Sequence, residues 1–118
     1  MMELWQTEWC PASRRIRQRL TELDVTYVLR QVPVDKVGRG ALVAATGSDA
    51  IPVLVLEDGA ALVDEAAIGA WLDANVSEPS GAEEHRAKAA TAHRREVQEA
   101  AEELVAAMPT HSSPEVSR

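Results

Sequence analysis

The residue with the clearest chemical potential is Cys10, the one cysteine in the 118-residue chain. It follows the strand-like segment 3–7 and precedes Pro11, a residue suited to the first turn of a helix. Helix N-terminal N–H groups stabilise a thiolate, which is the reactive form of cysteine. A free thiol with a pKa of ~8.5 is only ~3% ionised at pH 7, so this position would increase its reactivity. We therefore predict a reactive thiol at Cys10.

Most of the side chains near Cys10 favour the same chemistry. Ser13 can donate its hydroxyl to the sulfur, and the following helical turns add the positive charges of Arg14, Arg15 and Arg17. The carboxylate of Glu8 acts in the opposite direction, because a nearby negative charge opposes thiolate formation. The alternative is a buried and inert cysteine, which is common for this residue type.

A second landmark is Pro52, which opens the apolar segment 53–57. Proline is normally excluded from central strands. At the start of a strand, in a chain whose nucleophile follows another strand, it predicts a cis Ile51–Pro52 bond beside the sulfur. A trans proline in an edge strand is the alternative.

The hydrophobic pattern predicts the elements that position these residues. Strands are predicted at 3–7, 26–32, 53–57 and 60–63. Helices are predicted at 11–23, at 41–46 and after Asp64, which is a good N-cap. Because Asp58-Gly59 is a hairpin turn, the order β-α-β-α-β-β-α joins a parallel crossover to an antiparallel hairpin. The fold class is therefore α/β, with helices packed on a small mixed sheet.

A single long helix is predicted in the last third of the chain. Residues 76–81 contain Pro79 and Gly81 and are expected to link a domain at 1–75 to a helix at 82–108. Residues 109–118 have no packing pattern and are expected to form a disordered tail.

The predicted helix at 82–108 has an apolar stripe, made of Val97, Ala101, Leu104 and Met108. An isolated helix of this length is only marginally stable in water, so this stripe needs a partner surface. We expect the helix to dock on the domain or on a second copy of itself, which would make a homodimer.

Composition and charge exclude several classes of function. The net charge of −7 disfavours nucleic acid and membrane surfaces as partners, because both carry negative charge. No apolar run approaches the roughly 20 residues of a membrane helix, and we expect a cytoplasmic protein. His85 and His93 lie eight residues apart, roughly 12 Å along a helix, so no metal site is predicted.

Three segments resemble glutaredoxins and the N-terminal domain of glutathione S-transferases, above all the omega class. The run Cys10-Pro11-Ala12-Ser13-Arg14-Arg15-Ile16-Arg17 resembles both the glutaredoxin run Cys-Pro-Tyr-Cys-x-Arg-x-Lys and the omega-class run Cys-Pro-Phe-Ala-x-Arg-x-Arg. Ile51-Pro52-Val53-Leu54 resembles the cis-proline segment of both families. The segment 58–68 resembles the transferase stretch Asp-Gly…Leu-x-Glu-Ser-x-Ala-Ile. The resemblance covers residues 3–74 and implies a thioredoxin-like fold, here with an added C-terminal helix.

The resemblance also implies a site for glutathione or another low-molecular-weight thiol as co-substrate. Cys10 would be the nucleophile, assisted by Ser13. The backbone of Ile51, before cis-Pro52, would pair with the cysteinyl part of glutathione. The γ-glutamyl group would be held by Asp64 and Glu65, and the expected small-thiol site is completed by Trp9, Pro11 and Arg15.

The first functional hypothesis is a monothiol glutaredoxin-like thiol–disulfide oxidoreductase. Ser13 stands where a dithiol glutaredoxin has its second cysteine, so an internal disulfide is excluded. Cys10 would attack mixed disulfides between protein substrates and a small thiol, and a second small thiol would release it. One alternative is a non-catalytic binding module, or an iron–sulfur cluster carrier that uses Cys10. The lowest-ranked alternative is a truncated glutathione transferase, since the helical second domain is missing.

Overall fold

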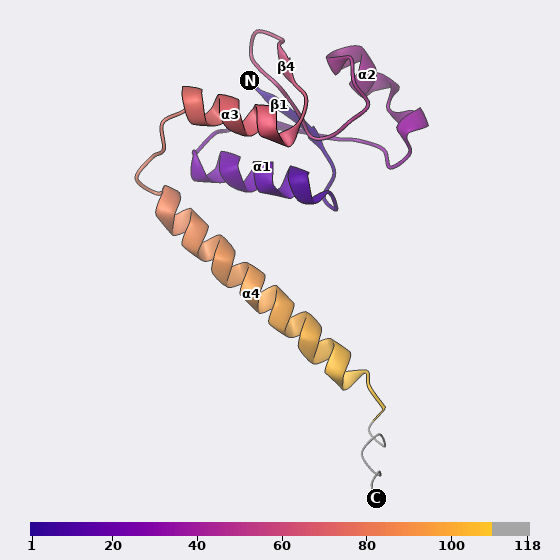
Figure 1. The fold of residues 1–118 in the computed structure, drawn as a ribbon, viewed down its shortest axis with the longest axis vertical. Coiled ribbons are helices and arrows are strands. Elements are labelled where there is room, and N and C mark those ends of the chain that lie inside the picture. Colours follow the sequence, from indigo (N-terminus) through magenta and orange to yellow (C-terminus); the bar gives the residue numbers. More distant parts are fainter. Residues whose placement is uncertain (110–118) are drawn as a thin grey trace, which may run out of the picture. The chain divides into compact units, whose positions relative to one another are not determined.

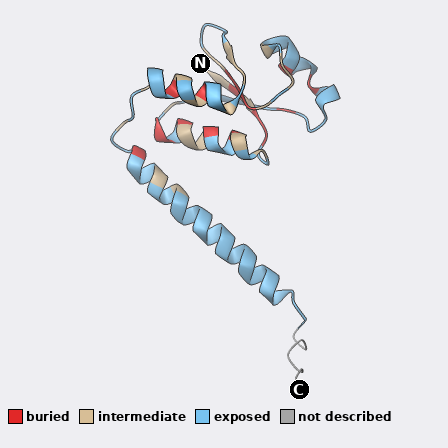
Figure 2. Cartoon of the chain, viewed as in Figure 1, coloured by how far each residue is buried: buried red, intermediate tan, exposed pale blue. Residues whose placement is uncertain are grey.

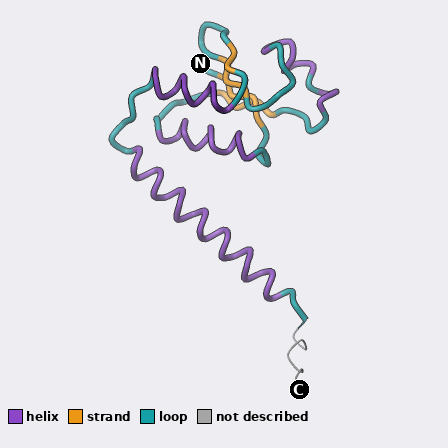
Figure 3. Tube along the Cα trace, in the orientation of Figure 1, coloured by secondary structure: helices purple, strands orange, loops and turns teal. Residues whose placement is uncertain are grey.

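The computed structural model describes residues 1–109 and has the predicted α/β architecture (Figures 1 and 3). Its strands are Glu3–Gln6 (β1), Val28–Gln31 (β2), Val53–Val55 (β3) and Ala61–Leu62 (β4). Its α-helices are Pro11–Glu22 (α1), Gly40–Thr46 (α2), Glu65–Asn75 (α3) and Ala82–Ala106 (α4), and a short 3-10 helix (η1) spans Lys36–Gly38. The chain divides into two compact units, Met1–His85 and the residues from Arg86 onward.

The sheet of the first unit has the strand order β2-β1-β3-β4. β1 pairs with β2 in parallel, whereas β3 is antiparallel to both β1 and β4. This combination is the predicted one: a parallel crossover through α1, followed by an antiparallel hairpin. The α/β class and the thioredoxin-like element order are therefore confirmed.

Two apolar clusters hold helices to the two faces of the sheet. The larger cluster joins the sheet to α1 and α3, and its buried members are Leu4, Ile16, Leu20, Leu23, Leu54, Ile68 and Leu72. The smaller cluster joins the other face to α2 through Val32, Leu42 and Val53. Figure 2 shows buried residues at intervals along both α1 and α3. Each fully buried aliphatic side chain contributes ~1.5–3 kcal/mol, so the larger cluster dominates the stability of the unit.

The strands are shorter than the hydrophobic pattern predicts. The second strand is Val28–Gln31 instead of 26–32, because the four residues of β1 pair with these four alone. β3 ends at Val55 instead of residue 57, because its hairpin partner β4 has only two residues. η1 was not predicted by the apolar pattern, since none of its residues is buried.

A buried arginine fastens the loops on either side of α2. Arg39 is 5% exposed, and its guanidinium donates hydrogen bonds to three backbone carbonyls. Nε bonds Pro33 O at 2.9 Å, one terminal nitrogen bonds Asp49 O at 2.7 Å, and the other bonds Val34 O at 3.1 Å. The segment that leads into Ile51–Pro52 is thereby anchored to the segment that leaves β2.

A second arginine ties α1 to α3 and to the chain that follows it. Arg19 contacts Asp73 at 3.1 Å and Glu78 at 2.9 Å, in addition to Glu22 on its own helix at 3.0 Å. Glu78 lies in the predicted linker 76–81, so one side chain of α1 restrains that segment. These contacts raise the pKa of Arg19 far above its ordinary value, and the hydrogen bond to Glu78 is the largest cause.

The long helix α4 begins at Ala82 as predicted and ends at Ala106, two residues before the predicted limit of 108. Its first residue is buried, whereas every residue from Ala90 to Pro109 is exposed. Within residues 1–109, none of the helices combines the length and apolar composition that crossing a bilayer requires. The tail predicted at 109–118 lies, apart from Pro109, outside the described residues.

We predict that Arg39→Ala destabilises the first unit by about 2–4 kcal/mol, because three backbone carbonyls lose the charged donor of a buried side chain. Urea unfolding followed by circular dichroism measures this change. Arg30→Ala is a suitable control, since Arg30 lies at the surface and pairs with the partly exposed Glu3. Equal stability losses in both variants would contradict a special role for Arg39.

We further predict that the domain of 1–75 with its linker folds without most of α4. Ala82 is only 1% exposed, so the first turn of α4 belongs to the core of the first unit. A chain ending at His85 should unfold cooperatively at nearly the full-length temperature, whereas a chain ending at Gly81 should unfold at a lower one. Thermal melts by circular dichroism test this, and an unfolded His85 truncation would show that α4 is required for the domain.

Candidate functional site

The sheet register brings the predicted site residues to one end of the sheet. β1 leads from Gln6 through a short loop to Cys10 at the start of α1. Trp5 pairs with Val53 in the antiparallel neighbour, so Pro52 lies at this same end. Leu54 pairs with Leu62, which places the residues after β4 here as well. Three segments far apart in the sequence therefore converge where β1 ends.

Cys10 is the N-cap residue of α1 and is a free, partly buried cysteine. Its Sγ accepts a hydrogen bond from the backbone N–H of Ser13 at 3.4 Å, in the manner of a capping side chain. Partial burial alone would raise the pKa of the Cys10 thiol. Hydrogen bonds from Ser13 and Ala12 and the charge of Arg15 outweigh this effect, so the pKa lies below its ordinary value.

The side chain of Ser13 is fully buried beneath the sulfur-bearing turn. Its hydroxyl is near enough to Cys10 to lower the pKa of the thiol. Among residues 1–109, however, Oγ has no hydrogen-bond partner of good geometry. A buried hydroxyl without a partner is costly. It is therefore a ready donor to an anionic sulfur at Cys10.

The predicted residues Arg15 and Glu65 form an ion pair between α1 and α3. Nε of Arg15 lies 2.6 Å from one carboxylate oxygen of Glu65, and a terminal nitrogen lies 2.8 Å from the other. This bidentate contact lowers the pKa of Glu65, and its hydrogen bonds are the largest cause. Arg15 therefore interacts with two anionic groups. It pairs directly with the Glu65 carboxylate, and its charge stabilises the Cys10 thiolate at longer range.

Arg17 has a different role from the one that its position in the sequence predicts. Its guanidinium bonds the side chain of Gln6, lies 3.4 Å from the carbonyl of Thr7 and lies 3.4 Å from the carboxylate of Glu8. Arg17 thus holds the loop between β1 and Cys10, and it balances the one carboxylate that opposes thiolate formation. Sequence reasoning missed this contact with Gln6, although a glutamine on the buried face of a strand is a signal for a polar partner.

The remaining predicted residues lie around the same end of the sheet. Trp9 is 61% exposed in the loop before Cys10, and Pro11 is the first residue of α1. The Ile51–Pro52 peptide bond is cis, and Pro52 is buried. Asp64 caps α3 by accepting a hydrogen bond from the N–H of Ala67 at 2.8 Å, which occupies one of its oxygens.

A surface groove of about 610 Å³ extends from the Arg15–Glu65 pair between α1 and α3. Its wall on α3 is made of small residues, and its lining is Arg15, Ile16, Arg19, Glu65, Ala66, Gly69, Ala70 and Asp73. The groove gives the charged pair an open approach from solvent.

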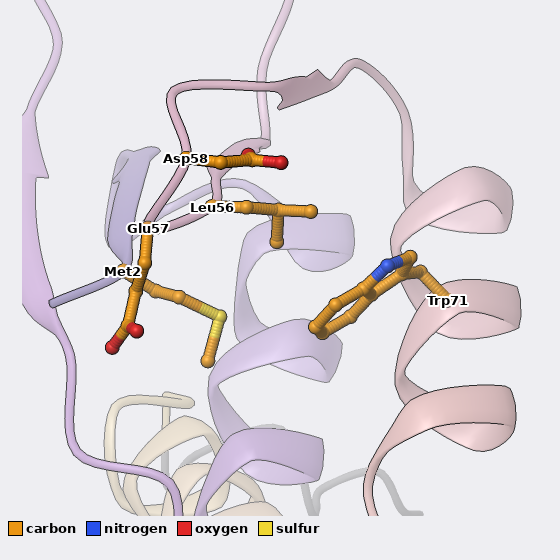
Figure 4. A pocket seen from close by; sticks show the side chains of 5 residues that line it. All are labelled: Met2, Leu56, Glu57, Asp58 and Trp71. Carbon is orange, nitrogen blue, oxygen red and sulfur yellow. The ribbon is translucent and has the colours of Figure 1, made fainter.

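A second pocket, of about 400 Å³, lies at the opposite end of the sheet. Met2 precedes β1 and Leu56 follows β3, so these residues are remote from the end where α1 begins. Figure 4 shows Met2 and Trp71 on two sides of this pocket with Leu56 between them. The residues that line this pocket include none of the predicted site residues.

We predict that iodoacetamide alkylation of Cys10 has a pH midpoint below the free-thiol value of about 8.5. Ser13→Ala should raise this midpoint by about 0.5–1 unit, because the thiolate loses a hydroxyl donor. Arg14→Ala is the control, because the arginine whose charge lowers the thiol pKa is Arg15 and not Arg14. A native midpoint at or above the free-thiol value would mean that burial outweighs the stabilising contacts.

Comparison with known proteins agrees with this geometry. The family model for the glutathione S-transferase N-terminal domain matches residues 4–80. A glutathione S-transferase from Rhodospirillum rubrum F11 is 30% identical with a TM-score of 0.58, over 68% of this chain and 36% of that one. A glutathione S-transferase from Methylobacillus flagellatus, solved with glutathione bound, is 26% identical with a TM-score of 0.56, over 64% and 37%. No curated protein matches the chain.

A glutaredoxin shares the same fold. Glutaredoxin 2 of Salmonella typhimurium, in complex with glutathione, is 19% identical with a TM-score of 0.54, over 62% of this chain and 33% of that one. The chain thus spans about a third of the length of each of these three proteins. The match over residues 4–80 and the thioredoxin-like sheet show that the chain belongs to the glutathione S-transferase N-terminal domain family.

Proposed function

We propose that this chain is a monothiol, glutaredoxin-like thiol–disulfide oxidoreductase that acts on mixed disulfides with glutathione or another small thiol. The observation that carries the proposal is the setting of Cys10 at the N-cap of α1, where its thiol pKa is lowered. The attacking species in thiol–disulfide exchange is the thiolate, and attack is most efficient when the thiol pKa lies near the ambient pH. The same contacts stabilise the sulfur when it leaves.

The proposed reaction has two exchange steps. In the first, the Cys10 thiolate attacks the small-thiol sulfur of a mixed disulfide, and a new disulfide forms as the protein thiolate leaves and takes up a proton. In the second, the thiolate of another small-thiol molecule attacks the sulfur bound to Cys10. The products are a symmetrical small-thiol disulfide and the free Cys10 thiolate. In the net exchange, one free small thiol and the mixed disulfide give the protein thiol and the symmetrical small-thiol disulfide, so the incoming small thiol is oxidised as the protein sulfur is reduced.

The chain has no second cysteine that could resolve the intermediate, because Cys10 is its one cysteine and position 13 is serine. Release of Cys10 therefore depends on a thiol from solution. The partly exposed position of Cys10 leaves the sulfur accessible to such a thiol. The chemistry needs a compartment that keeps thiols reduced, which is the basis for proposing a cytoplasmic location.

Glutathione is the proposed small thiol because a family relative, the transferase from Methylobacillus flagellatus, was solved with glutathione bound. In this chain the backbone at Ile51 and the cis-proline Pro52 lie at the Cys10 end of the sheet and would bind the cysteinyl part. The acidic pair Asp64 and Glu65 would face the γ-glutamyl ammonium. Arg15 offsets the negative charge of Glu65. This would reduce the repulsion between Glu65 and the carboxylate of the γ-glutamyl group.

A second candidate function is glutathione transfer to an electrophile. It is favoured by the family match and by relatives that are glutathione S-transferases of about three times the aligned length. In that case Cys10 and the small-thiol site would belong to one half of a larger active site. Conjugation of glutathione to 1-chloro-2,4-dinitrobenzene separates this candidate from disulfide exchange.

We predict that Cys10→Ser abolishes reduction of a glutathione mixed disulfide, measured with glutathione, glutathione reductase and NADPH. Arg14→Ala is the matched control in the same helix and should retain activity. Ser13→Cys should give an internal disulfide with Cys10 on mild oxidation, detectable as a loss of two mass units, because residue 13 already contacts the sulfur. Undiminished reduction by Cys10→Ser would exclude the proposed mechanism, since the sequence holds no other sulfur nucleophile.

A further inference from the structure

The pocket at the end of the sheet opposite Cys10 has three apolar walls, which come from different parts of the first unit. Met2 precedes β1, Leu56 follows β3, and Trp71 lies on α3. All three side chains are half-buried and pack against the larger apolar cluster. The volume of about 400 Å³ falls within the range of roughly 300–1,000 Å³ that small-molecule sites occupy. The pocket therefore has room for one aromatic ring with a short side chain.

Two of the walls are held in place by the fold itself. The N–H of Leu56 donates to the carbonyl of Ala60 at 2.8 Å, and the carbonyl of Leu56 accepts a bond from the N–H of Gly59 at 2.9 Å. Gly59 has a φ of 90°, which glycine adopts without strain. Trp71 stands next to Leu72, whose buried side chain holds α3 to the sheet. The pocket therefore exists before any ligand arrives.

Asp58 adds a negative charge to this apolar pocket. One of its carboxylate oxygens accepts a hydrogen bond from the N–H of Ala60 at 2.9 Å, which fixes the side chain in the turn. Figure 4 shows the carboxylate extending over Leu56, on the side of the pocket where the indole nitrogen of Trp71 lies. Within residues 1–109, no cationic group forms an ion pair with Asp58.

The neighbouring acid has a different setting. The carboxylate of Glu57 points away from Trp71 in Figure 4, and it lies 3.8 Å from the N-terminal ammonium of Met1. That ammonium balances Glu57 and leaves Asp58 as the charge that a ligand meets. Asp58 repels an anion, and an uncharged apolar ligand gains nothing from it. A cation gains from the carboxylate of Asp58 and from the indole of Trp71 together.

We propose that this pocket binds a primary arylalkylamine in its ammonium form. The aromatic ring lies between Met2 and Trp71, since both a thioether and an indole make favourable contacts with an aromatic ring. The ammonium lies at the opening of the pocket, beside the carboxylate of Asp58. Because Asp58 is exposed, the ammonium keeps part of its hydration shell and its desolvation costs little. This binding site is separate from the thiol site and needs no reaction at Cys10.

Nuclear magnetic resonance titration of the isotope-labelled full chain with phenethylammonium chloride tests the proposal. Saturable shifts are expected at the indole N–H of Trp71 and at the backbone of Leu56 and Asp58, with a Kd of roughly 0.1–1 mM for so small a ligand. Phenethyl alcohol has the same ring without the charge and should bind at least about fivefold more weakly, and the anion hydrocinnamate should not bind. The absence of saturable shifts at these residues, or equal affinity for the alcohol, would overturn the proposal.

A pair of matched variants tests the role of the carboxylate. Asp58→Asn keeps an oxygen that accepts the Ala60 N–H, so the turn is retained while the charge is lost. It should weaken phenethylammonium binding roughly fivefold and leave phenethyl alcohol binding unchanged. Asp35→Asn removes the same charge from the N-cap of η1, where the side chain makes no capping hydrogen bond, and should change neither affinity. Equal affinities for phenethylammonium in the two variants would exclude Asp58 as its partner.

Alkylation of Cys10 separates this pocket from the thiol end of the sheet, where Asp64 and Glu65 also carry negative charge. Phenethylammonium should bind the iodoacetamide-treated chain with unchanged affinity, and the shifts should remain at Trp71. Loss of binding on alkylation would place the amine at the thiol end and overturn the proposal. A chain that binds the amine but fails to reduce mixed disulfides would support this pocket and contradict the proposed oxidoreductase function alone.

Discussion

The register of β1 with β3 is the constraint on which the rest of the site depends. Trp5 pairs with Val53, and this single alignment fixes where the chain leaves the sheet toward Cys10 and where it enters at Pro52. A shift by one residue would turn Leu4 and Gln6 from the buried face to the other face. The larger apolar cluster therefore enforces the alignment, since Leu4 is one of its fully buried members. Packing far from the sulfur thus determines the surroundings of the sulfur.

The arginines that follow Cys10 have different electrostatic roles. Arg15 holds Glu65 and stabilises the thiolate, whereas Arg17 is occupied with the loop before Cys10 and with Glu8. The thiolate is stabilised chiefly by short-range donors, namely the backbone and side chain of Ser13 and the backbone of Ala12. Short-range donors keep their effect at physiological salt, which screens exposed charges at longer range.

The sequence was sufficient to predict the element order and the end of the sheet that carries the thiol. Both follow from local patterns: the apolar periodicity of Ile16, Leu20 and the C-cap residue Leu23 along α1, the turn at Asp58-Gly59, and the N-cap at Asp64. The pairing of Arg15 with Glu65 could not be predicted in this way, because 50 residues separate the two side chains. The backbone carbonyls that Arg39 binds could not be predicted either. Every residue has a backbone carbonyl, and no sequence pattern shows which of them are left without a hydrogen bond in the helices and strands. Sequence periodicity identifies which face is buried, but it does not identify which polar groups meet there.

The arginine at position 39 has a consequence for the motions of the molecule. It bonds carbonyls on both sides of α2, at Pro33 and Val34 and at Asp49, so neither flanking loop can move away without breaking a bond to the same guanidinium. We therefore expect local opening of residues 33–50 to be cooperative, with both loops and the intervening helix exchanging their amide hydrogens as one unit. Because Asp49 leads into the Ile51–Pro52 bond, the same opening would also move this side of the candidate thiol site.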